Sequence, residues 1–388
     1  VIRSSSRGLG VVCLRIGNLK QVNLLMLVTA VSCGAGVLIG QHQKAVAQPP
    51  KGMQWALRQM DDDDGAISRS EAKGRMLANF DRVDQDSSGL IDKAELSLLF
   101  KRLREARGRG PSAGTSSVPG NVELRENVAY REGNEKWKLD LVLPKNREDE
   151  LSPVVVFIHG GGWRNGDKSS GVFRDYPLEY ASRGYVCASI NYRLVDEGTI
   201  LDCIADCKCA VRWLRAHAKE FSIDTNHFGG YGNSAGAHLV AMLGLSSVQD
   251  ELKGDGPYRE YSSALQAVCS SATPTNFRLW GEEVRSGGGR DAALFGVDNT
   301  EKVMELASPV TYVTSTSPPF LMVHGTADTT VPVQQSDDLN KLFQEHESQD
   351  VTYLRINGAG HGVFRQHASE TVPAMRTFFD RVLRGNSE

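Results

Sequence analysis

The chain has 388 residues, more than one ordinary domain needs, so we expect more than one structural unit. Its 44 lysines and arginines nearly balance 47 aspartates and glutamates, which gives a formal net charge of -3 at pH 7. With 40% hydrophobic residues, this is the composition of a soluble globular protein. The charge balance argues against a chain that follows a phosphate backbone, so no nucleic-acid partner is expected.

The first 47 residues have the order of features of an export signal. Basic residues come first, an apolar run at 22–39 follows, and the small-residue site Ala45-Val46-Ala47 comes last. This order predicts a signal peptide at 1–47, cleavage after Ala47, and a periplasmic or secreted protein. An uncleaved membrane anchor is the alternative, because the apolar run is about long enough to span a bilayer. Lipidation at Cys33 ranks third.

A loop with the spacing of a calcium site begins at Asp84. It has oxygen-bearing side chains at positions one, three, five and nine, glycine at six, an aliphatic residue at eight and glutamate at twelve, as in an EF-hand loop. The expected calcium ligands are Asp84, Asp86, Ser88, the Leu90 carbonyl, Asp92 and a bidentate Glu95. An acidic turn that binds no metal is the alternative.

A second acidic loop at 61–71 is one residue short of the same spacing. If Gly65 takes the glycine position, Met60 falls at position one and offers no hard oxygen. Apolar residues at helical spacing flank the intact loop. We therefore expect a small all-α EF-hand domain at 48–107, with one firm and one degenerate calcium site. Its role would be structural or docking, with a protein or a surface as partner.

Residues 108–121 are rich in glycine, serine and proline, a composition that cannot bury a core. They are expected to form a flexible linker. The remaining residues, 122–388, would then form the catalytic domain, moving independently of the first.

The pentapeptide Gly232-Asn233-Ser234-Ala235-Gly236 lies between a strand-like and a helix-like run. By itself, G-x-S-x-G often marks only a turn. In this setting, a sharp strand-to-helix turn exposes a serine Oγ to the base that it needs. Ser234 is therefore the predicted nucleophile, and the amide of Ala235, in the first helical turn, is expected to face an oxyanion.

A glycine cluster follows the strand-like run at 153–158. Gly161 and Gly162 could present bare amides to a tetrahedral intermediate, which would complete an oxyanion hole. A flexible loop or a phosphate nest is the alternative, although no lysine follows at P-loop spacing.

Asp328 and His361 both follow short strand-like runs, at 319–323 and 351–356. Both are therefore expected at the carboxyl edge of the sheet, where open α/β sheets carry their sites. His361 would exchange a proton with Ser234, and Asp328 would orient the imidazole. For Asp328, a plain turn residue is the alternative. Among the other histidines, we expect structural roles for His238, on the serine's own helix, and for His159 and His324, before glycines.

Five cysteines follow the predicted cleavage site. An exported protein can form disulfides, but Cys203 and Cys207 are one helical turn apart, a spacing that seldom gives a strain-free bond. Pairing stays open at this point. The five are Cys187, Cys203, Cys207, Cys209 and Cys269.

From about residue 121 onwards, the chain resembles the esterase and lipase branch of the α/β-hydrolase superfamily, in particular hormone-sensitive-lipase-like and feruloyl-esterase-like carboxylesterases. The motifs that carry the resemblance are LDLVLP from Leu139, HGGGW from His159, NYRL from Asn191, DCKCAVRWL from Asp206, GNSAG from Gly232, ASPV from Ala307, HGTAD from His324 and GAGHG from Gly358. They occur in family order, and they are specific for fold and nucleophile rather than for substrate.

The resemblance implies an α/β-hydrolase fold, with a mostly parallel central sheet and helices on both faces, preceded here by the EF-hand domain. It implies a triad of Ser234, Asp328 and His361, an oxyanion hole from the amides of Gly161, Gly162 and Ala235, and no cofactor for catalysis. The apolar residues we place nearest the substrate are Trp163, Tyr192, Phe277 and Trp280. Core packing is equally open for each of them.

The sequence thus predicts an exported serine carboxylesterase that cleaves short acyl or aryl esters through an acyl-enzyme intermediate. Its substrate would be a small-molecule or polysaccharide-linked ester, and no membrane contact is expected after signal cleavage. An arylformamidase-type amide hydrolase is the alternative enzyme, because of the similar glycine-tryptophan motif. A calcium-binding scaffold protein on an inactive hydrolase fold is the non-enzyme alternative.

Overall fold

The structure is a computed structural model that describes residues 66–70, 72, 80–84, 86–92, 95, 96, 98, 117–145, 150–279, 294–296, 300–348 and 350–385. The chain divides into two compact units, residues 1–106 and 107–388. The predicted signal peptide lies outside the described residues, as does most of the predicted linker. No helix in the described ranges has both the length and the apolarity of a membrane span.

The larger unit is built on one eight-stranded sheet with the strand order β10-β9-β8-β7-β5-β6-β4-β3. The strands are β3 (Val122–Ala129), β4 (Lys138–Pro144), β5 (Ser152–Ile158), β6 (Val186–Ile190), β7 (Ile223–Asn233), β8 (Ala267–Ser271), β9 (Phe320–Gly325) and β10 (Val351–Ile356). β3 and β4 pair antiparallel, and β4 runs antiparallel to β6. The remaining pairs are parallel, so the carboxyl ends of β5 to β10 meet at one edge.

The central strand β5 explains why the sheet needs cover on both faces. Successive side chains of a strand point to opposite faces, and Val154, Val156 and Ile158 pack in one core while Val155 and Phe157 pack in another. All five side chains are fully buried. A strand that is apolar on both faces is typical of a parallel sheet between two helical layers.

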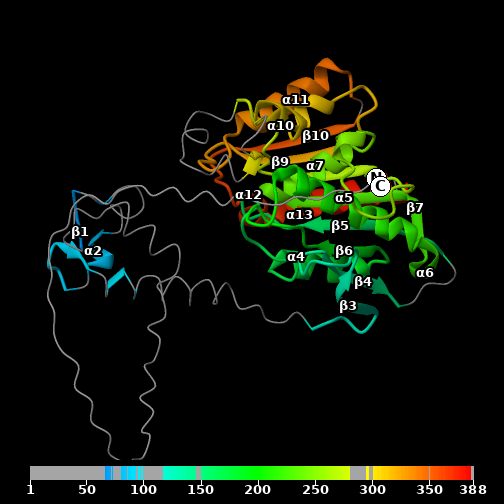
Figure 1. The fold of residues 1–388 in the computed structure, drawn as a ribbon, viewed down its shortest axis with the longest axis horizontal. Coiled ribbons are helices and arrows are strands. Elements are labelled where there is room, and N and C mark those ends of the chain that lie inside the picture. The colour runs from blue at the N-terminus through cyan, green and yellow to red at the C-terminus, as the bar shows by residue number, and fades with distance from the viewer. Residues whose placement is uncertain are drawn as a thin grey trace, which may run out of the picture. The chain divides into compact units, whose positions relative to one another are not determined.

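Helices fill both layers (Figure 1). The core on the side of Val154 includes residues of α5 (Ile200–Ala216), α7 (Ala235–Leu245), α10 (Thr300–Leu306) and α11 (Gln334–Glu345). The core on the side of Val155 includes residues of α4 (Val172–Ser182), α12 (Val363–Gln366) and α13 (Ala368–Arg384). The other described elements of the larger unit are short: α6 (Ala218–Phe221), η2 (Asp250–Leu252) and η3 (Pro309–Tyr312). The expected mostly parallel sheet with helices on both faces is confirmed.

In the smaller unit, the described elements are β1 (Ile67–Ser68), α2 (Phe80–Val83) and β2 (Leu90–Ile91). β1 and β2 pair antiparallel, with Ile67 opposite Ile91. Six residues form a separate apolar cluster: Ile67, Ala72, Phe80, Val83, Ile91 and Leu96. This unit therefore has a small core of its own.

Candidate active site

Ser234 lies at a sharp turn between β7 and α7. Its backbone has φ 54° and ψ -124°, a conformation that non-glycine residues rarely adopt. The Ser234 amide donates a 2.8 Å hydrogen bond to the Ser271 carbonyl of β8, and the Ser234 carbonyl accepts from the His238 amide. These two bonds hold the strained residue between the sheet and the helix, and its side chain stays partly exposed at the sheet edge.

The two flanking glycines allow this turn to pack tightly. A Cβ on Gly232 would lie 2.3 Å from the Gly236 carbonyl carbon, and a Cβ on Gly236 would lie 2.0 Å from the Ile158 oxygen of β5. Any side chain at either position would therefore push α7 away from the sheet. Glycine is needed here for close approach, in addition to the freedom that it gives the backbone.

The loops that carry Asp328 and His361 follow β9 and β10 and are joined by their backbones. The Ala327 amide donates to the Ala359 carbonyl at 2.9 Å, and the Thr326 amide donates to the Ile356 carbonyl at 3.0 Å. Gly325 permits the contact, since a Cβ there would lie 2.2 Å from the Ala359 oxygen. Because these strands are adjacent and parallel, the two side chains reach the same edge as Ser234.

Ser234, Asp328 and His361 form one hydrogen-bonded series. His361 Nε2 lies 3.0 Å from Ser234 Oγ, and His361 Nδ1 lies 2.8 Å from Asp328 Oδ2. Since a carboxylate only accepts, Nδ1 carries the hydrogen and Nε2 is free to accept from the serine hydroxyl. The His361 side chain is 29% exposed, whereas that of Asp328 is fully buried. The imidazole thus joins a buried carboxylate to a hydroxyl at the surface.

The Asp328 carboxylate is surrounded by donors. Its Oδ1 accepts from the Thr330 amide at 2.8 Å and the Val331 amide at 3.0 Å. Burial by itself raises the pKa of Asp328, but hydrogen bonds from His324, His361 and these two amides hold that pKa well below its usual value. The carboxylate therefore stays ionised at neutral pH.

His324 also contacts the Asp328 carboxylate, a contact that the sequence did not predict. Its Nε2 lies 3.0 Å from the Val331 oxygen and 3.3 Å from Asp328 Oδ2, and its Nδ1 lies 2.7 Å from Ser336 Oγ. Both neighbours of Nε2 accept, so Nε2 carries the hydrogen and the Ser336 hydroxyl donates to Nδ1. The side chain is fully buried. The four-residue spacing from His324 to Asp328 was the only sequence signal for this contact.

Gly160, rather than Gly161 or Gly162, lies directly against the serine. A Cβ on Gly160 would lie 2.7 Å from the Asn233 oxygen and 3.3 Å from the Ser234 Cβ. Gly161 and Gly162 follow with φ of 118° and 62°, and both are exposed. The amides of Arg164 and Asn165 donate to the Gly161 carbonyl and close a tight turn. Ala235 is buried at the first position of α7, at the helical end where backbone amides lack intrahelical partners.

The residues expected near the substrate are mostly packed inside the protein. Tyr192 is fully buried, stacks on His159 at 4.5 Å between ring centroids, and donates its hydroxyl to the His159 carbonyl. Trp163 and Phe277 are 5% and 2% exposed and meet edge-on at 5.7 Å. The expectation that Tyr192 lies next to the substrate is therefore wrong, and its side chain packs in the core instead. Trp280 lies outside the described residues.

His238 has the structural surroundings expected from its position on α7. Trp163 Nε1 donates to its Nδ1 at 3.3 Å, and its Nε2 donates to the Ala307 carbonyl at 2.7 Å. Burial lowers the pKa of His238 to about 4. A neutral imidazole therefore joins the glycine loop to the segment before η3.

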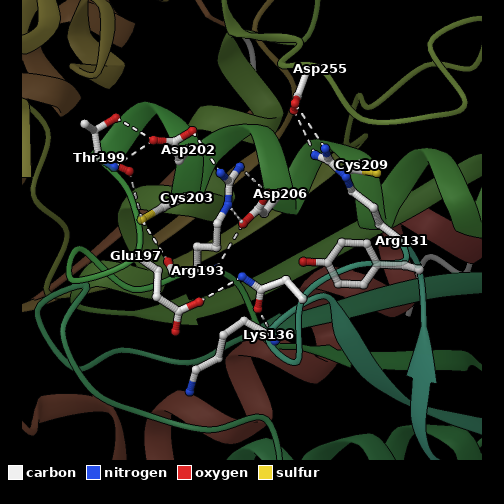
Figure 2. A network of polar contacts seen from close by, with 12 residues as sticks. Arg131, Lys136, Arg193, Glu197, Thr199, Asp202, Cys203, Asp206, Cys209 and Asp255 are labelled. Atoms are coloured by element: carbon white, nitrogen blue, oxygen red, sulfur yellow. Dashed lines mark hydrogen bonds and ion pairs between the residues drawn. The ribbon is translucent and has the colours of Figure 1, made fainter.

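An ion-pair network fixes the loop that follows β6 (Figure 2). The Arg193 guanidinium makes two 2.8 Å hydrogen bonds to the fully buried carboxylate of Asp206 on α5, and Asp202 lies 3.2 Å from the same guanidinium. The hydrogen bonds to Asp206 raise the pKa of Arg193, so it keeps its charge. Because the Val195 amide donates to the Trp163 carbonyl, this anchored loop also supports the glycine turn.

A hollow of about 380 Å³ adjoins the candidate triad. Its described lining includes His361, Asn233 and Ser271 at the sheet edge, together with residues of α4 and α12. Trp163, Tyr192 and Phe277 are not part of this lining. The hollow is within the size range of ligand pockets, about 300–1,000 Å³.

The candidate metal site lies in the smaller unit. Carboxylate oxygens of Asp84, Asp86 and Glu95 all lie within 4.8 Å of one another. The amides of Ser88 and Gly89 donate to Asp84, and Gly89 has φ 83°, as the sharp turn requires. The Ser88 hydroxyl lies 3.0 Å from the Leu90 carbonyl. The Glu95 amide donates to Asp92. The loop thus gathers hard oxygens of the kind that calcium prefers.

The five described cysteines, Cys187, Cys203, Cys207, Cys209 and Cys269, are all buried free thiols. Burial raises the pKa of each of them. They behave as apolar core residues rather than as nucleophiles.

Comparisons with known proteins agree with the fold and with an esterase activity. Esterase LipC of Mycobacterium tuberculosis is 26% identical over 384 residues, covering 94% of this chain and 92% of LipC. LipM of the same organism, a probable carboxylic ester hydrolase, is 26% identical and covers 77% of this chain and 72% of LipM. A truncated carbohydrate esterase from gut microbiota has a similar fold, with a TM-score of 0.59, 24% identity, and 68% of this chain and 96% of that chain covered.

These findings and the sheet with its strand-to-helix serine turn define a serine ester hydrolase of the α/β-hydrolase fold. The BD-FAE family profile matches residues 139–343, more than half of the chain, and the protein belongs to that family.

Proposed function

We propose that Ser234, His361 and Asp328 act as the catalytic triad of a carboxylesterase. The observation that carries this proposal is the pair of contacts made by His361, 3.0 Å to Ser234 Oγ and 2.8 Å to Asp328 Oδ2. A serine hydroxyl needs such a base, and the base needs a carboxylate to fix its tautomer.

In the proposed reaction, Ser234 Oγ attacks the ester carbonyl while His361 Nε2 takes the hydroxyl proton. The tetrahedral oxyanion is held by the amide of Ala235 and by amides of the glycine turn at Gly161 and Gly162, and Gly160 keeps that turn against the serine. His361 then protonates the leaving alcohol, which gives an acyl-enzyme that water hydrolyses by the reverse proton transfers. One oxyanion donor contributes about 3–4 kcal/mol to transition-state stabilisation. These steps need no cofactor.

The proposed substrates are short acyl or aryl esters, on a small molecule or linked to a polysaccharide. The carbohydrate esterase among the similar structures supports the second source. The proposed site of action is the periplasm or the outside of the cell, on the strength of the leader at 1–47. The five buried free thiols are compatible with the periplasm and with the outside of the cell, because none of them needs a disulfide partner.

A substrate panel tests the ester specificity. Wild type is expected to hydrolyse p-nitrophenyl acetate and to prefer acetylated or aryl esters over N-formyl aromatic amines by at least about tenfold in kcat/KM. The Ser234→Ala variant should lose the ester activity by a factor on the order of ten thousand or more. Preference for the formyl amides would instead support the arylformamidase alternative. Ester hydrolysis at the same background rate by wild type and by Ser234→Ala would support the scaffold alternative.

We also propose that residues 48–107 form an EF-hand domain, joined to the catalytic domain at 122–388 by the linker at 108–121. The gathered oxygens of Asp84, Asp86 and Glu95 support a Ca²⁺ ion there, with Ser88, Leu90 and Asp92 completing the shell. The pairing of Ile67 with Ile91 supports a two-loop module, because these residues hold equivalent positions in the short and the intact loop. The ion would stabilise this domain and prepare it for docking to a protein or a surface.

A further inference from the structure

The hollow beside His361 has an aromatic wall. Tyr231 of β7 lies 4.7 Å from Phe364 of α12, 5.9 Å from Tyr176 and 6.2 Å from Phe173 of α4, all measured between ring centroids. Tyr231, Phe173 and Phe364 are buried, whereas Tyr176 is partly exposed. Rings held in place by one another form a rigid surface on which a planar or cyclic group can pack.

The charge of this lining is positive. Arg365 is exposed, and the part of the chain that the structure describes offers its guanidinium no carboxylate or hydrogen-bond partner. No aspartate or glutamate is present among the described residues that line the hollow. The protein as a whole has a net charge of -3, so the positive charge of this lining is a local exception. A positive lining favours an anionic group on the ligand.

The position of the hollow indicates which half of an ester would occupy it. In the reaction proposed above, His361 Nε2 donates a proton to the leaving alcohol oxygen, which must then lie within about 2.6–3.2 Å of that nitrogen. The alcohol half of the ester is therefore held next to His361, and His361 itself lines the hollow.

We propose that this hollow binds the alcohol half of the substrate, packing a ring against Tyr176, and that Arg365 selects alcohols that carry a carboxylate. This inference rests on the proposed triad, because it takes the proton transfer by His361 as given. In this proposal the Arg365 guanidinium pairs with the carboxylate on the alcohol half of the substrate, and Arg365 takes no part in bond making or breaking.

A matched pair of esters tests the inference. Phenyl acetate and m-acetoxybenzoate share the acyl group and the ring, and differ only in the carboxylate on the alcohol half. The measured quantity is the ratio of kcat/KM for m-acetoxybenzoate to that for phenyl acetate within each protein, which cancels differences in the folded fraction. We expect Arg365→Ala to lower this ratio about fivefold, mostly through KM, because an ion pair on an accessible rim contributes modestly.

Two variants serve as controls. Arg365→Lys should retain the ratio within about twofold, since it keeps the charge. Arg278→Ala removes an exposed arginine that pairs with Glu305 at a different hollow, and it should retain the wild-type ratio. Raising the ionic strength should lower the wild-type ratio towards that of Arg365→Ala.

The outcomes separate this inference from the function on which it rests. A ratio that is equal in wild type and Arg365→Ala, with phenyl acetate still hydrolysed, overturns the selection by Arg365 alone. A second pair, phenyl benzoate and the phenyl monoester of terephthalic acid, places the carboxylate on the acyl half. If Arg365→Ala lowers only that second ratio, the assignment to the alcohol half is wrong. No turnover of any neutral ester by wild type would overturn the proposed function itself, and this inference with it.

Discussion

At the scale of single residues, one carboxylate oxygen is shared by two histidines. Asp328 Oδ2 lies 2.8 Å from His361 Nδ1 and 3.3 Å from His324 Nε2. Among the described residues, His361 and His324 are the titratable side chains in contact with Asp328. Each N–H that reaches a carboxylate lowers its basicity and fixes its orientation, so His324 is expected to set how strongly Asp328 holds His361.

Replacing His324 should change the pH dependence of catalysis. The lowered pKa of Asp328 keeps the carboxylate charged through and below its usual titration range, and its contribution to stability is lost as the pH falls through the lower, folded-state value. The acid limb of kcat/KM therefore does not come from Asp328. In His324→Leu, Asp328 loses a donor and becomes a stronger hydrogen-bond acceptor for the protonated imidazole of His361. The acid limb of the kcat/KM profile should therefore shift to higher pH, and kcat/KM should fall about tenfold at neutral pH.

The control is His324→Gln, whose side-chain amide can still donate, and which should restore the limb towards its wild-type position. A purely structural role for His324 predicts a different result. In that case, melting temperature and kcat/KM would fall together in His324→Leu, and the limb would stay where it is in wild type.

At the scale of elements, the sheet edge brings the site together. β5 and β7 pair with Ile158 opposite Gly232, and β10 and β9 pair with Ile356 opposite Gly325, so the two loops that follow each pair begin side by side. α7 approaches β5 so closely at Gly236 that a Cβ there would lie 2.0 Å from the Ile158 oxygen. The placement of Ser234 thus depends on the close packing of α7 against β5 at Gly236.

Gly236→Ala tests this dependence. The added Cβ would meet the Ile158 carbonyl, so α7 must shift, and we expect a loss of about 1–3 kcal/mol in the free energy of unfolding. Gly120→Ala is the matched control, because a Cβ there has open space, and it should be within about 0.5 kcal/mol of wild type. Denaturant unfolding measures both. Equal stability of the two variants would contradict the packing argument.

Sequence patterns predicted those elements whose signals are local. The strand predictions at 153–158 and 351–356 match β5 and β10, because apolar runs and alternation depend on near neighbours. The contact of His324 with Asp328 could not be predicted in the same way, since it depends on how a loop folds back onto its strand. Tyr192 was expected near substrate but stacks on His159, because an aromatic side chain after a strand can face either the pocket or the core.

At the scale of the whole molecule, the chain divides into two compact units with separate apolar cores. The candidate calcium ligands and the candidate triad belong to different units. Units with their own cores can unfold in separate transitions. Calcium is therefore expected to act on stability in the first unit and not on chemistry in the second.

Calorimetry of the full chain tests the calcium site. Titration with Ca²⁺ should give about one ion bound per chain, and saturation should raise the lower of two melting transitions, because an ion that binds only the folded unit stabilises it. The kcat/KM for p-nitrophenyl acetate should change less than about twofold.

Glu95→Gln should abolish this binding by removing the bidentate ligand. Glu71→Gln removes the same charge from the short loop and should retain the ion, which makes it the matched control. The calcium proposal fails if wild type gives no binding heat and its melting is insensitive to chelator.

The most direct measurement for the central claim is covalent labelling with an organophosphonate ester, followed by mass spectrometry of the digested protein. A serine activated by His361 should be phosphonylated about once per chain, on the peptide that contains Ser234, with loss of p-nitrophenyl acetate turnover in the same proportion. The Ser234→Ala variant should remain unlabelled. An adduct on any other side chain in step with the loss of activity, or an active protein that takes no label at Ser234, would contradict the account.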